Sequence, residues 1–477
     1  MNRPGPFALE PEQAETLTGG RWHGARDAVT AHGAAIDSRR VTAGMLFACF
    51  KGEHVDGHAY AGAAVEAGAV LVLATEILDL SVPVLVVPSV AQAMAALAAA
   101  FRASRDDAVW IGVTGSNGKT TVKELIAAAC GGSQVVHATS GNYNNELGVP
   151  LTILATPAEA RFVVVEMGAA GCGQIAQLAA IAQPHIGVIT SIGPAHLEGF
   201  GGIEGVARGK SELFAAITDG GRLLFARHGL EQVCESHAAD VDGVLAIIRG
   251  AAAHGVLTVV GDPGCPVAGE LADSGLTLRT PVGEVGLNLV GQHNLVNATL
   301  AWHAAVAAGV EPKQALRNMA GVRATSGRLM LKGLGQHRVL DDSYNANPAS
   351  MSAGLGVLAS QGGARIAVLG AMGELGATSE ALHAQVGREA ARLGVPVITV
   401  VAGAIAAGYR AAGGRDCREV ETCDAAVELI LERFAVGPTS VLVKASRSSG
   451  LDAVVRGLER RTGYGPGTGA YKEVDRC

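Results

Sequence analysis

Short apolar runs alternate with helical patterns along most of this chain of 477 residues. An apolar run bounded by turn residues predicts a buried strand, and apolar residues at three- and four-residue spacing predict a helix. Strands that alternate with helices predict an α/β protein with open, mainly parallel sheets. The expected strands are 45–50, 69–74, 83–87, 109–113, 161–166, 186–190, 329–331, 339–342, 365–369, 395–401 and 441–444. The expected helices are 7–20, 58–67, one opening at 119, one beginning near 203, 295–308, 383–393 and one from 451.

The length of the chain favours roughly three domains, at about 150 residues per domain. Residues 1–87 form a small α/β unit that precedes a glycine-rich turn. Residues 88–319 surround this turn and are expected to form a central parallel-sheet domain. Residues 320–477 carry a further series of strands and helices, which predicts a second open sheet, and 463–477 are expected to be a loose tail.

Composition and charge exclude several classes of protein. The longest uncharged run, 81–101, is broken by Pro83 and Pro88, so it predicts a strand, a turn and a helix and not a membrane span. The N-terminus lacks the apolar core of a signal peptide, and we expect a cytoplasmic protein without membrane insertion. A net charge of −7 without a basic block disfavours nucleic-acid binding. The eight cysteines show no CxxC pair or zinc-finger spacing, which predicts reduced thiols.

The strongest chemical signal is the stretch VWIGVTGSNGKTT at 109–121. A buried strand ends in a turn of small residues, and Lys119 opens the helix that follows. Backbone N–H groups of such a turn bind an anion together with the helix dipole. Lys119 then suits the phosphates of a nucleotide, and Thr120 offers a hydroxyl to Mg²⁺. Val113 stands where the usual pattern has glycine, and a glycine-rich turn with a solvated lysine is the alternative.

Other segments carry candidate ligand-binding groups. Glu166 ends the strand 161–166, and ligands of doubly wound sheets gather at such carboxyl ends. A carboxylate there suits Mg²⁺ beside the phosphate loop, although it can also simply end a strand. The asparagine-rich segment 139–150 is predicted to be a loop that can face a ligand. Asn294, at the start of an alanine-rich helix, can either cap the helix or contact a base.

Three further sites have ordinary explanations when each is taken alone. His196 follows a proline turn, and hydrogen bonding explains a lone histidine. Lys210 lies on an amphipathic helix, where a lysine is usually solvated. Ser38 and Arg39 follow Asp37 between predicted elements, and by themselves these residues are only a polar turn.

In combination, these segments resemble the ATP-dependent Mur ligases of peptidoglycan synthesis. The resemblance covers nearly the whole chain, and its motifs occur in the family's order and approximate spacing. These motifs are TGSNGKTT, EMG at Glu166, GPAHLEGFG at His196, GKSELF at Lys210, GQHNLVNA, SGR at Arg328 and DSYNANP. DSYNANP, with the opening segment IDSRRVTAGMLFACFKGEHVDGH, most resembles the branch that adds D-alanyl-D-alanine.

The resemblance implies a nucleotide-sugar-binding domain at 1–87, a P-loop ATPase domain at 88–319 and a Rossmann-like domain at 320–477. It assigns the phosphates of ATP to Gly115, Ser116, Asn117, Gly118, Lys119, Thr120 and Thr121. It assigns Mg²⁺ to Thr120, Glu166, His196 and Lys210, the lysine after carbamylation. It places Asn294 at the adenine, Arg328 at the γ-phosphate and Asp342 at the ribose. It places the other substrates at Ser38, Arg39, Asn145, Asn347 and Arg447.

The implied reaction joins D-alanyl-D-alanine to UDP-N-acetylmuramoyl-tripeptide through an acyl phosphate, with ADP and phosphate as products. Lys119, Lys210, His196 and Arg328 would be its catalytic residues, the protein would act as a monomer, and the product would serve cell shape and division. Three residues depart from the family's pattern: Gln174 stands in place of Glu, Gly209 in place of a common Ala, and Ala445 in place of the Gly of KGSR. A folylpolyglutamate synthetase and a nucleotide-dependent switch without ligase chemistry are the alternative functions.

Overall fold

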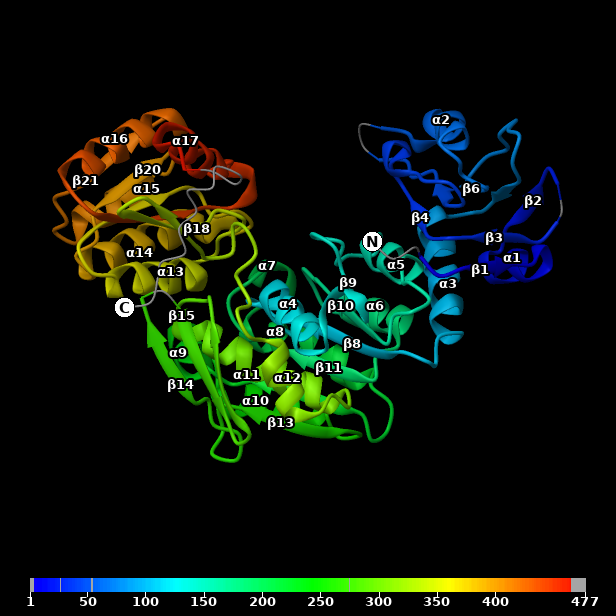
Figure 1. Ribbon diagram of the computed structural model, residues 1–477, viewed down its shortest axis with the longest axis horizontal. Coiled ribbons are helices and arrows are strands. Elements are labelled where there is room, and N and C mark those ends of the chain that lie inside the picture. The colour runs from blue at the N-terminus through cyan, green and yellow to red at the C-terminus, as the bar shows by residue number, and fades with distance from the viewer. Residues whose placement is uncertain (1–3, 26, 53–54, 274, 465–477) are drawn as a thin grey trace.

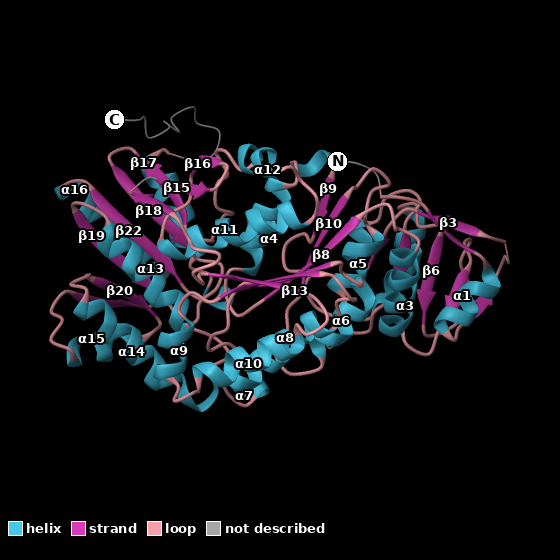
Figure 2. Ribbon diagram, turned by 90° about the horizontal axis from the view of Figure 1, so that it is seen from below, coloured by secondary structure: helices cyan, strands magenta, loops and turns pink. Residues whose placement is uncertain are grey.

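The computed structural model describes residues 4–25, 27–52, 55–273 and 275–464, which form three lobes (Figure 1). In this view the first lobe (blue) and the last (yellow to red) stand at opposite ends of the central one and on the same side of it. Figure 2 shows the strands of the three lobes as separate layers. Most of the predicted tail, 465–477, lies outside the described residues. None of the helices within the described ranges has the length and apolar character needed to cross a membrane.

The first lobe is built on a five-stranded sheet of order β2-β7-β6-β5-β4, parallel except for β2, with a separate antiparallel pair, β1 and β3. Its elements are β1 (Phe7–Leu9), α1 (Pro11–Thr18), β2 (Arg21–His23), β3 (Val29–Ala31), β4 (Ala34–Ala35), η1 (Ser38–Arg40), β5 (Leu46–Ala48), η2 (Gly57–Tyr60), α2 (Ala61–Glu66), β6 (Leu71–Ala74) and β7 (Val84–Val86).

The expected helix over 7–20 is wrong in its first part. Phe7 and Leu9 are buried and Ala8 between them is exposed, which is the alternation of a strand. The helix begins only at Pro11, because proline is favoured in the first helical turn and has no amide hydrogen to contribute to the preceding strand.

The central lobe is built on a fully parallel six-stranded sheet of order β13-β12-β11-β8-β10-β9, next to a small antiparallel sheet of β14, β15 and β16. Its elements are α3 (Val90–Ala103), β8 (Val109–Thr114), α4 (Lys119–Ala129), η3 (Gly132–Gln134), β9 (Val136–Ala138), α5 (Gly148–Leu154), β10 (Phe162–Glu166), α6 (Gln174–Ala182), β11 (Ile186–Ile189), α7 (Leu197–Phe200), α8 (Ile203–Ala215), β12 (Arg222–Ala226), α9 (Leu230–Ser236), α10 (Val241–Ala251), β13 (Val256–Val260), β14 (Gly269–Ala272), β15 (Gly275–Thr280), β16 (Gly283–Leu287), α11 (Gln292–Ala307) and α12 (Pro312–Asn318).

Two boundaries in this lobe differ from the expected ones. The predicted loop 139–150 ends at Gly148, where α5 begins, and Pro150 fits because it lies in the first turn of that helix. Helix α11 begins at Gln292, three residues before the expected start at Leu295. Asn294 therefore lies inside the first turn of the helix and is not its N-cap.

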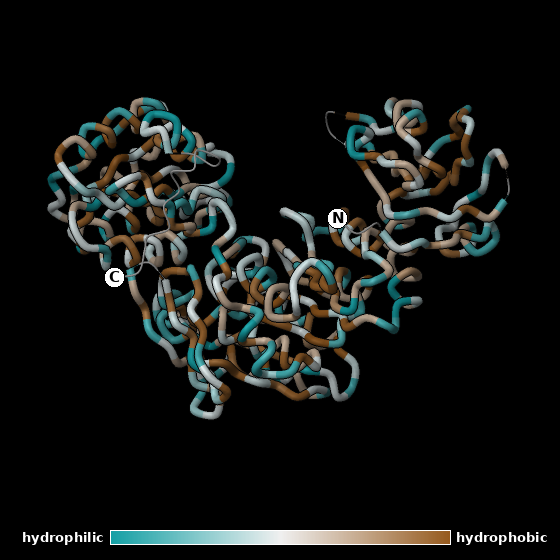
Figure 3. The backbone as a smooth tube through the Cα atoms, in the orientation of Figure 1, coloured by the Kyte–Doolittle hydropathy of each residue, from teal (hydrophilic) through white to brown (hydrophobic). Residues whose placement is uncertain are grey.

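The last lobe is built on a six-stranded sheet of order β17-β18-β22-β19-β20-β21, parallel except for β17. Its elements are β17 (Met330–Leu334), β18 (His337–Asp342), α13 (Pro348–Ser360), β19 (Ala364–Leu369), η4 (Gly376–Thr378), α14 (Ser379–Arg392), β20 (Val397–Val400), α15 (Gly403–Ala411), β21 (Cys417–Val420), α16 (Cys423–Val436), β22 (Thr439–Lys444), η5 (Arg447–Ser449) and α17 (Asp452–Thr462). Buried apolar side chains cover both faces of this sheet, with α13, α14 and α15 on one side and α16 and α17 on the other. Figure 3 shows hydrophobic segments of the backbone in all three lobes.

Helix α3 connects the cores of the first and central lobes. It packs against α1 on one side and against α5 and α6 on the other. The ring of Phe101 in α3 contacts that of Phe7 edge-on, with 5.7 Å between centroids. One continuous cluster of buried apolar side chains therefore runs from the first sheet through α3 to Trp110 in the central sheet.

Candidate active site

The phosphate loop, residues 115–118, connects β8 to α4 at the carboxyl edge of the central sheet. Gly115 has φ of +145°, and a Cβ on it would lie 2.1 Å from Oγ1 of Thr190. Gly118 has φ of +83° and precedes the first residue of α4, and a Cβ there would lie 2.9 Å from Oδ1 of Asn297. Only glycine satisfies both the positive φ and the close approach. The turn predicted from the sequence is confirmed, including its opening of the helix at Lys119.

Polar groups at the end of β11 hold this loop in place. Oγ of Ser116 donates to the carbonyl of Gly193 and accepts from its N–H, both at 2.9 Å. The N–H of Asn117 donates to Oγ of Ser191 at 2.9 Å, and the carbonyl of Asn117 accepts a hydrogen bond from the hydroxyl of Thr190. The loop is thus held by the protein's own polar groups, and such support lowers the entropic cost of binding.

Lys119 folds back over the phosphate loop. Its Nζ donates to the carbonyls of Gly115 at 2.7 Å and of Ser116 at 3.4 Å. Burial lowers the pKa of Lys119, and the charge of Arg328 adds to this effect while Glu166 opposes it. A partly desolvated ammonium next to loop N–H groups is suited to bind a phosphate, because the anion restores the lost solvation.

Glu166 lies at the end of β10, beside β8, and is 2% exposed. Its Oε2 accepts a hydrogen bond from Oγ1 of Thr120 at 2.9 Å, and its Oε1 accepts one from Nδ2 of Asn144 at 2.8 Å. The N–H of Glu166 donates to Oγ1 of Thr139 at 2.9 Å. A hydroxyl and a carboxylate held together are the hard oxygen donors that suit Mg²⁺. Among the described residues there is no group of three or more His, Cys, Asp or Glu side chains that could hold a metal by themselves.

Two residues of the last lobe reach the phosphate loop and the start of α4. Nη2 of Arg328 donates to Oγ1 of Thr120 at 3.3 Å, and its guanidinium lies 4.0 Å from the centroid of the Tyr344 ring. Nδ2 of Asn347 donates to Oδ1 of Asn117 at 2.7 Å. Asn347 is also the N-cap of α13, so the start of this helix is placed beside the loop.

Asp342 and Lys444 form an ion pair at the carboxyl edge of the last sheet, in which the lysine is buried and the aspartate partly exposed. They are direct partners in the register of β18 and β22, and Nζ of Lys444 lies 2.6 Å from Oδ2 of Asp342. Nζ also donates to the carbonyl of Asn345 at 3.0 Å. This pair faces the phosphate loop across the cleft described next.

A cleft of about 1450 Å³ lies between the central and last lobes. The predicted site residues that line it are Ser116, Asn117, Gly118, Lys119, Thr120, Thr121, Asn145, Glu166, His196, Asn294, Arg328, Asp342 and Asn347. Those that do not line it are Gly115, Ser38, Arg39, Lys210 and Arg447. The cleft thus brings together residues of the central and last lobes that are far apart in the sequence, such as Asn117 and Asn347, which are 230 positions apart (Figure 1).

The predicted residues outside the cleft have other contacts. Arg39 pairs with Asp37 in the first lobe, and this hydrogen bond lowers the pKa of Asp37 to about 2. Arg447 is exposed, and its guanidinium lies 5.7 Å from the centroid of the Tyr344 ring. Arg40, which the sequence did not single out, contacts Tyr143 of the central lobe through the ring and the hydroxyl.

The side-chain amides of Asn294 and Asn145 form hydrogen bonds with other groups of the protein. Nδ2 of Asn294 donates to the carbonyl of Val290 at 2.9 Å, and its Oδ1 accepts from Nδ2 of Asn297 at 3.0 Å. Asn294 is 3% exposed. Oδ1 of Asn145 accepts from the N–H of Gly148 and so closes the turn before α5.

His196 faces the last lobe. It has φ of +52°, and its Nδ1 lies 3.1 Å from Oε2 of Glu374, which also has a positive φ. Burial lowers the pKa of His196, while Glu374 acts to raise it. Lys210 is buried behind the cleft wall, where its Nζ donates to the carbonyl of Ala169 at 3.1 Å and lies 5.0 Å from the centroid of the Phe200 ring. Burial, with a contribution from the charge of Lys119, lowers the pKa of Lys210 to about 7.

The structure gives physical reasons for two of the three departures. A Cβ on Gly209 would lie 2.4 Å from Cε1 of Phe200, so alanine does not fit without movement of that ring. Ala445 is fully buried, and its methyl group fills the space left by Gly370, where an added Cβ would lie 2.8 Å from it. Gln174 accepts a hydrogen bond from the N–H of Ala170 at 2.7 Å, a role that glutamate would also serve. Nothing in the structure explains why this position carries an amide.

Sequence reasoning missed four residues of the site. Tyr344 supports Arg328, Lys444 pairs with Asp342, Glu374 pairs with His196, and Asn144 orients Glu166. Lys444 ends a buried strand just as Glu166 does, and that position could have identified it. The other three lie on loops, where only the tertiary structure shows the contact.

Comparison with known proteins identifies the family. Three models match in order along the chain: the Mur ligase family catalytic domain at 30–102, the Mur ligase middle domain at 113–260 and the Mur ligase glutamate ligase domain at 327–447. The UDP-N-acetylmuramoyl-tripeptide–D-alanyl-D-alanine ligase of Escherichia coli (strain K12) is 34% identical over 437 residues, which are 90% of this chain and 94% of that protein. This chain belongs to the Mur ligase family.

Solved structures place this Mur ligase on the MurF branch. A crystal structure of MurF from Acinetobacter baumannii matches with a TM-score of 0.82 and 29% identity, over 95% of this chain and 99% of that one. MurF from Thermotoga maritima in complex with ADP matches with a TM-score of 0.76 and 25% identity, over 90% of this chain and 97% of that one. The α/β fold of three lobes expected from the sequence is confirmed.

Proposed function

We propose that this Mur ligase joins D-alanyl-D-alanine to UDP-N-acetylmuramoyl-tripeptide at the expense of ATP. The observation that carries the proposal is the cleft in which the phosphate loop, with Lys119 and Thr120 at the start of α4, faces Arg328 and Asn347 of the last lobe. The relatives named for this reaction match this chain over most of their length and of its length, and they share its fold. The product is a precursor of peptidoglycan, and thereby serves cell shape and division.

The proposed reaction has two stages. The terminal carboxylate of the tripeptide attacks the γ-phosphorus of ATP, the bond from the γ-phosphorus to the bridging oxygen breaks, and ADP leaves. The amine of D-alanyl-D-alanine then attacks the acyl carbon, loses a proton and expels phosphate. Lys119 and Arg328 would offset the negative charge on the transferred phosphoryl group, and the two lobes would hold the reactants together.

The remaining assignments follow from this proposal. Thr120 and Glu166 would hold Mg²⁺, which supplies positive charge to the phosphates when bound. Asp342 would bind the ribose, Asn294 the adenine, and His196 with a carbamylated Lys210 a second Mg²⁺. The first lobe, within 1–87, would bind the UDP-sugar through Ser38 and Arg39, with Asn145, Asn347 and Arg447 at the peptide and dipeptide. Residues 88–319 and 320–477 would be the ATPase and ligase domains of a cytoplasmic monomer.

A substrate panel tests the function. Phosphate release is measured with ATP and Mg²⁺ while UDP-N-acetylmuramoyl-tripeptide and D-alanyl-D-alanine are omitted in turn, and the product is identified by mass. We expect release only with both substrates, together with a mass equal to that of the pentapeptide product. Release with folate and glutamate would instead identify a folylpolyglutamate synthetase. Release without any acceptor would identify a nucleotide-dependent switch.

A further inference from the structure

The buried carboxylate of Asp341 lies next to the site but does not line the cleft. It precedes Asp342 in β18, and because successive side chains of a strand point to opposite faces, it is directed away from the ion pair of Asp342 and Lys444. Asp341 is 3% exposed. Such a buried charge is costly unless several donors compensate it, so its partners indicate its purpose.

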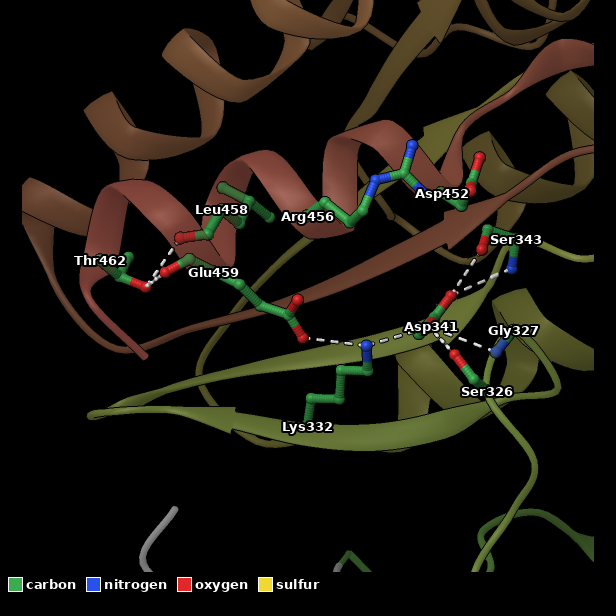
Figure 4. A network of polar contacts seen from close by, with 10 residues as sticks. All are labelled: Ser326, Gly327, Lys332, Asp341, Ser343, Asp452, Arg456, Leu458, Glu459 and Thr462. Atoms are coloured by element: carbon green, nitrogen blue, oxygen red, sulfur yellow. Dashed lines mark hydrogen bonds and ion pairs between the residues drawn. The ribbon is translucent and has the colours of Figure 1, made fainter. Parts of the chain in front are cut away.

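Figure 4 shows Asp341 between two turns, one with Ser326 and Gly327 and the other with Ser343. In the sequence these turns immediately precede Arg328 and Tyr344. Oδ2 of Asp341 accepts from the N–H of Gly327 at 3.2 Å and from Oγ of Ser326 at 3.5 Å. Its Oδ1 accepts from Oγ of Ser343 at 2.6 Å and from the N–H of Ser343 at 3.4 Å. One carboxylate thus joins the turn before Arg328 to the turn before Tyr344.

These two turns carry the arginine and the ring that supports it. Gly327 has φ of +74°, and its carbonyl accepts from the N–H of Tyr344 at 3.0 Å. The N–H of Arg328 donates to the carbonyl of Thr325 at 2.9 Å, which closes the turn. A shift of either turn would move the guanidinium away from Thr120, because no other contact of Arg328 in the described chain fixes it there.

The far side of Asp341 is anchored to the last helix. Nζ of Lys332 in β17 lies 3.3 Å from Oδ2 of Asp341 and 2.9 Å from Oε1 of Glu459 in α17, as Figure 4 shows. Desolvation acts to lower the pKa of Lys332, but the hydrogen bond to Glu459 and the charge of Asp341 together raise it, so the lysine stays charged. Asp341 is therefore tied to the sheet and helix of the last lobe as well as to the two turns.

We propose that Asp341 is a positioning residue that aims Arg328 at the phosphate loop by holding the turns at 326–327 and 343–344. The inference rests on the proposed function, because it assumes that Arg328 meets the γ-phosphate of ATP. It predicts that Asp341 affects the binding of a nucleoside triphosphate more than that of a diphosphate. A residue that only stabilises the lobe would affect both alike.

The test is Asp341→Asn in the full chain, with Glu428→Gln as the matched control. Glu428 forms an exposed ion pair with Arg461 in the same lobe, so the control removes a carboxylate charge whose partner is not in either turn. Binding of AMPPCP and of ADP is measured by calorimetry. For Asp341→Asn we expect AMPPCP affinity to fall by about tenfold to 100-fold, as for groups that orient a ligand-contacting residue, and ADP affinity to change less than twofold. Glu428→Gln should change neither.

A double-mutant cycle separates action through Arg328 from independent effects. If Asp341 acts through Arg328, Asp341→Asn adds no further loss of AMPPCP affinity in an Arg328→Ala background. Additive losses, or equal losses for ADP and AMPPCP, would overturn the proposal. If Asp341→Asn does not fold, Ser343→Ala removes the 2.6 Å hydrogen bond while keeping the carboxylate, and it should show the same selective loss at smaller size. The binding assay needs no ligation, so failure of the proposed reaction is recognised separately in the substrate panel.

Discussion

Lys210 should carry a carbamate when the enzyme is active, and replacing it should abolish ligation. Carbamylation requires a neutral amine, and burial lowers the pKa of Lys210 to about 7 from 10.5. At pH 7.5 about three quarters of the folded molecules would hold a neutral Lys210, compared with about one in 1000 for a lysine of ordinary pKa. The neutral, carbamate-forming fraction of Lys210 is therefore several hundred times larger than that of a lysine of ordinary pKa.

The pH dependence of stability provides the first measurement. The unfolded chain keeps the Lys210 proton up to a pH of about 10.5, whereas the folded chain releases it above about 7. The unfolded state thus binds more protons between these values, and the free energy of unfolding should rise with pH. The rise is about 1.4 kcal/mol per pH unit, or about 2.5 kcal/mol from pH 7.5 to 9.5. Because burial also lowers the pKa of Lys119, the reading is the difference between two curves: in guanidinium unfolding under CO₂-free argon, the rise in Lys210→Met should be smaller than in the wild type by about this amount.

The carbamate itself is detected with ¹³C-labelled bicarbonate. We expect one carbamate resonance in the wild-type protein that is absent from Lys210→Met. Lys210→Ala should lose ligase activity, and acetate or formate should restore part of it by supplying the missing carboxylate. Parallel stability curves for wild type and Lys210→Met would refute the lowered pKa. Wild-type turnover in Lys210→Ala, or no labelled resonance, would refute the carbamate.

Three other changes have defined outcomes. Lys119→Ala should lower turnover by about 100-fold or more while leaving the circular dichroism spectrum unchanged, because it removes the charge next to the phosphate loop; near-normal ligation by the folded variant would contradict this role. The last lobe should move as a rigid body when nucleotide and UDP-tripeptide bind, so small-angle scattering should show a smaller radius of gyration, and superimposable curves would exclude the motion. Gly209→Ala should lower the free energy of unfolding by about 1 kcal/mol, since the collision with Phe200 exceeds the gain in helix propensity; a more stable variant in thermal unfolding would show that the ring has room to move.

Local signals in the sequence predicted the elements that form the nucleotide side of the site. The strand, the glycine turn and the helix at 109–121 carry their own geometry, because the glycines are required by positive φ and the helix by its apolar spacing. The carboxyl end of a buried strand likewise identified Glu166. In these cases the residues that determine the structure are close together in the chain.

The remaining features depend on contacts between distant segments. No local pattern pairs His196 with Glu374, and the same is true of Arg328 with Tyr344 on neighbouring turns. The strand Phe7–Leu9 is not predictable from the sequence, because three residues are too few to show a strand period against the helical pattern that follows. Lys210 looked like a solvated lysine, and only the packing of Phe200 and the wall at Ala169 show it to be buried.

The packing of helix α3 determines which of the three lobes can move relative to one another. Apolar side chains on either side of α3 form one buried cluster. Separating the first lobe from the central lobe would therefore expose apolar surface to water. The two buried apolar clusters of the last lobe consist almost entirely of its own residues. Polar contacts, such as that of Asn347 with Asn117, link this lobe to the phosphate loop. This packing therefore favours movement of the last lobe relative to the other two, which share one buried cluster. In the proposed reaction the nucleotide sugar and the phosphates of ATP would bind to the first and central lobes. Movement of the last lobe would bring Arg328 to the phosphates and control the entry of the amine substrate.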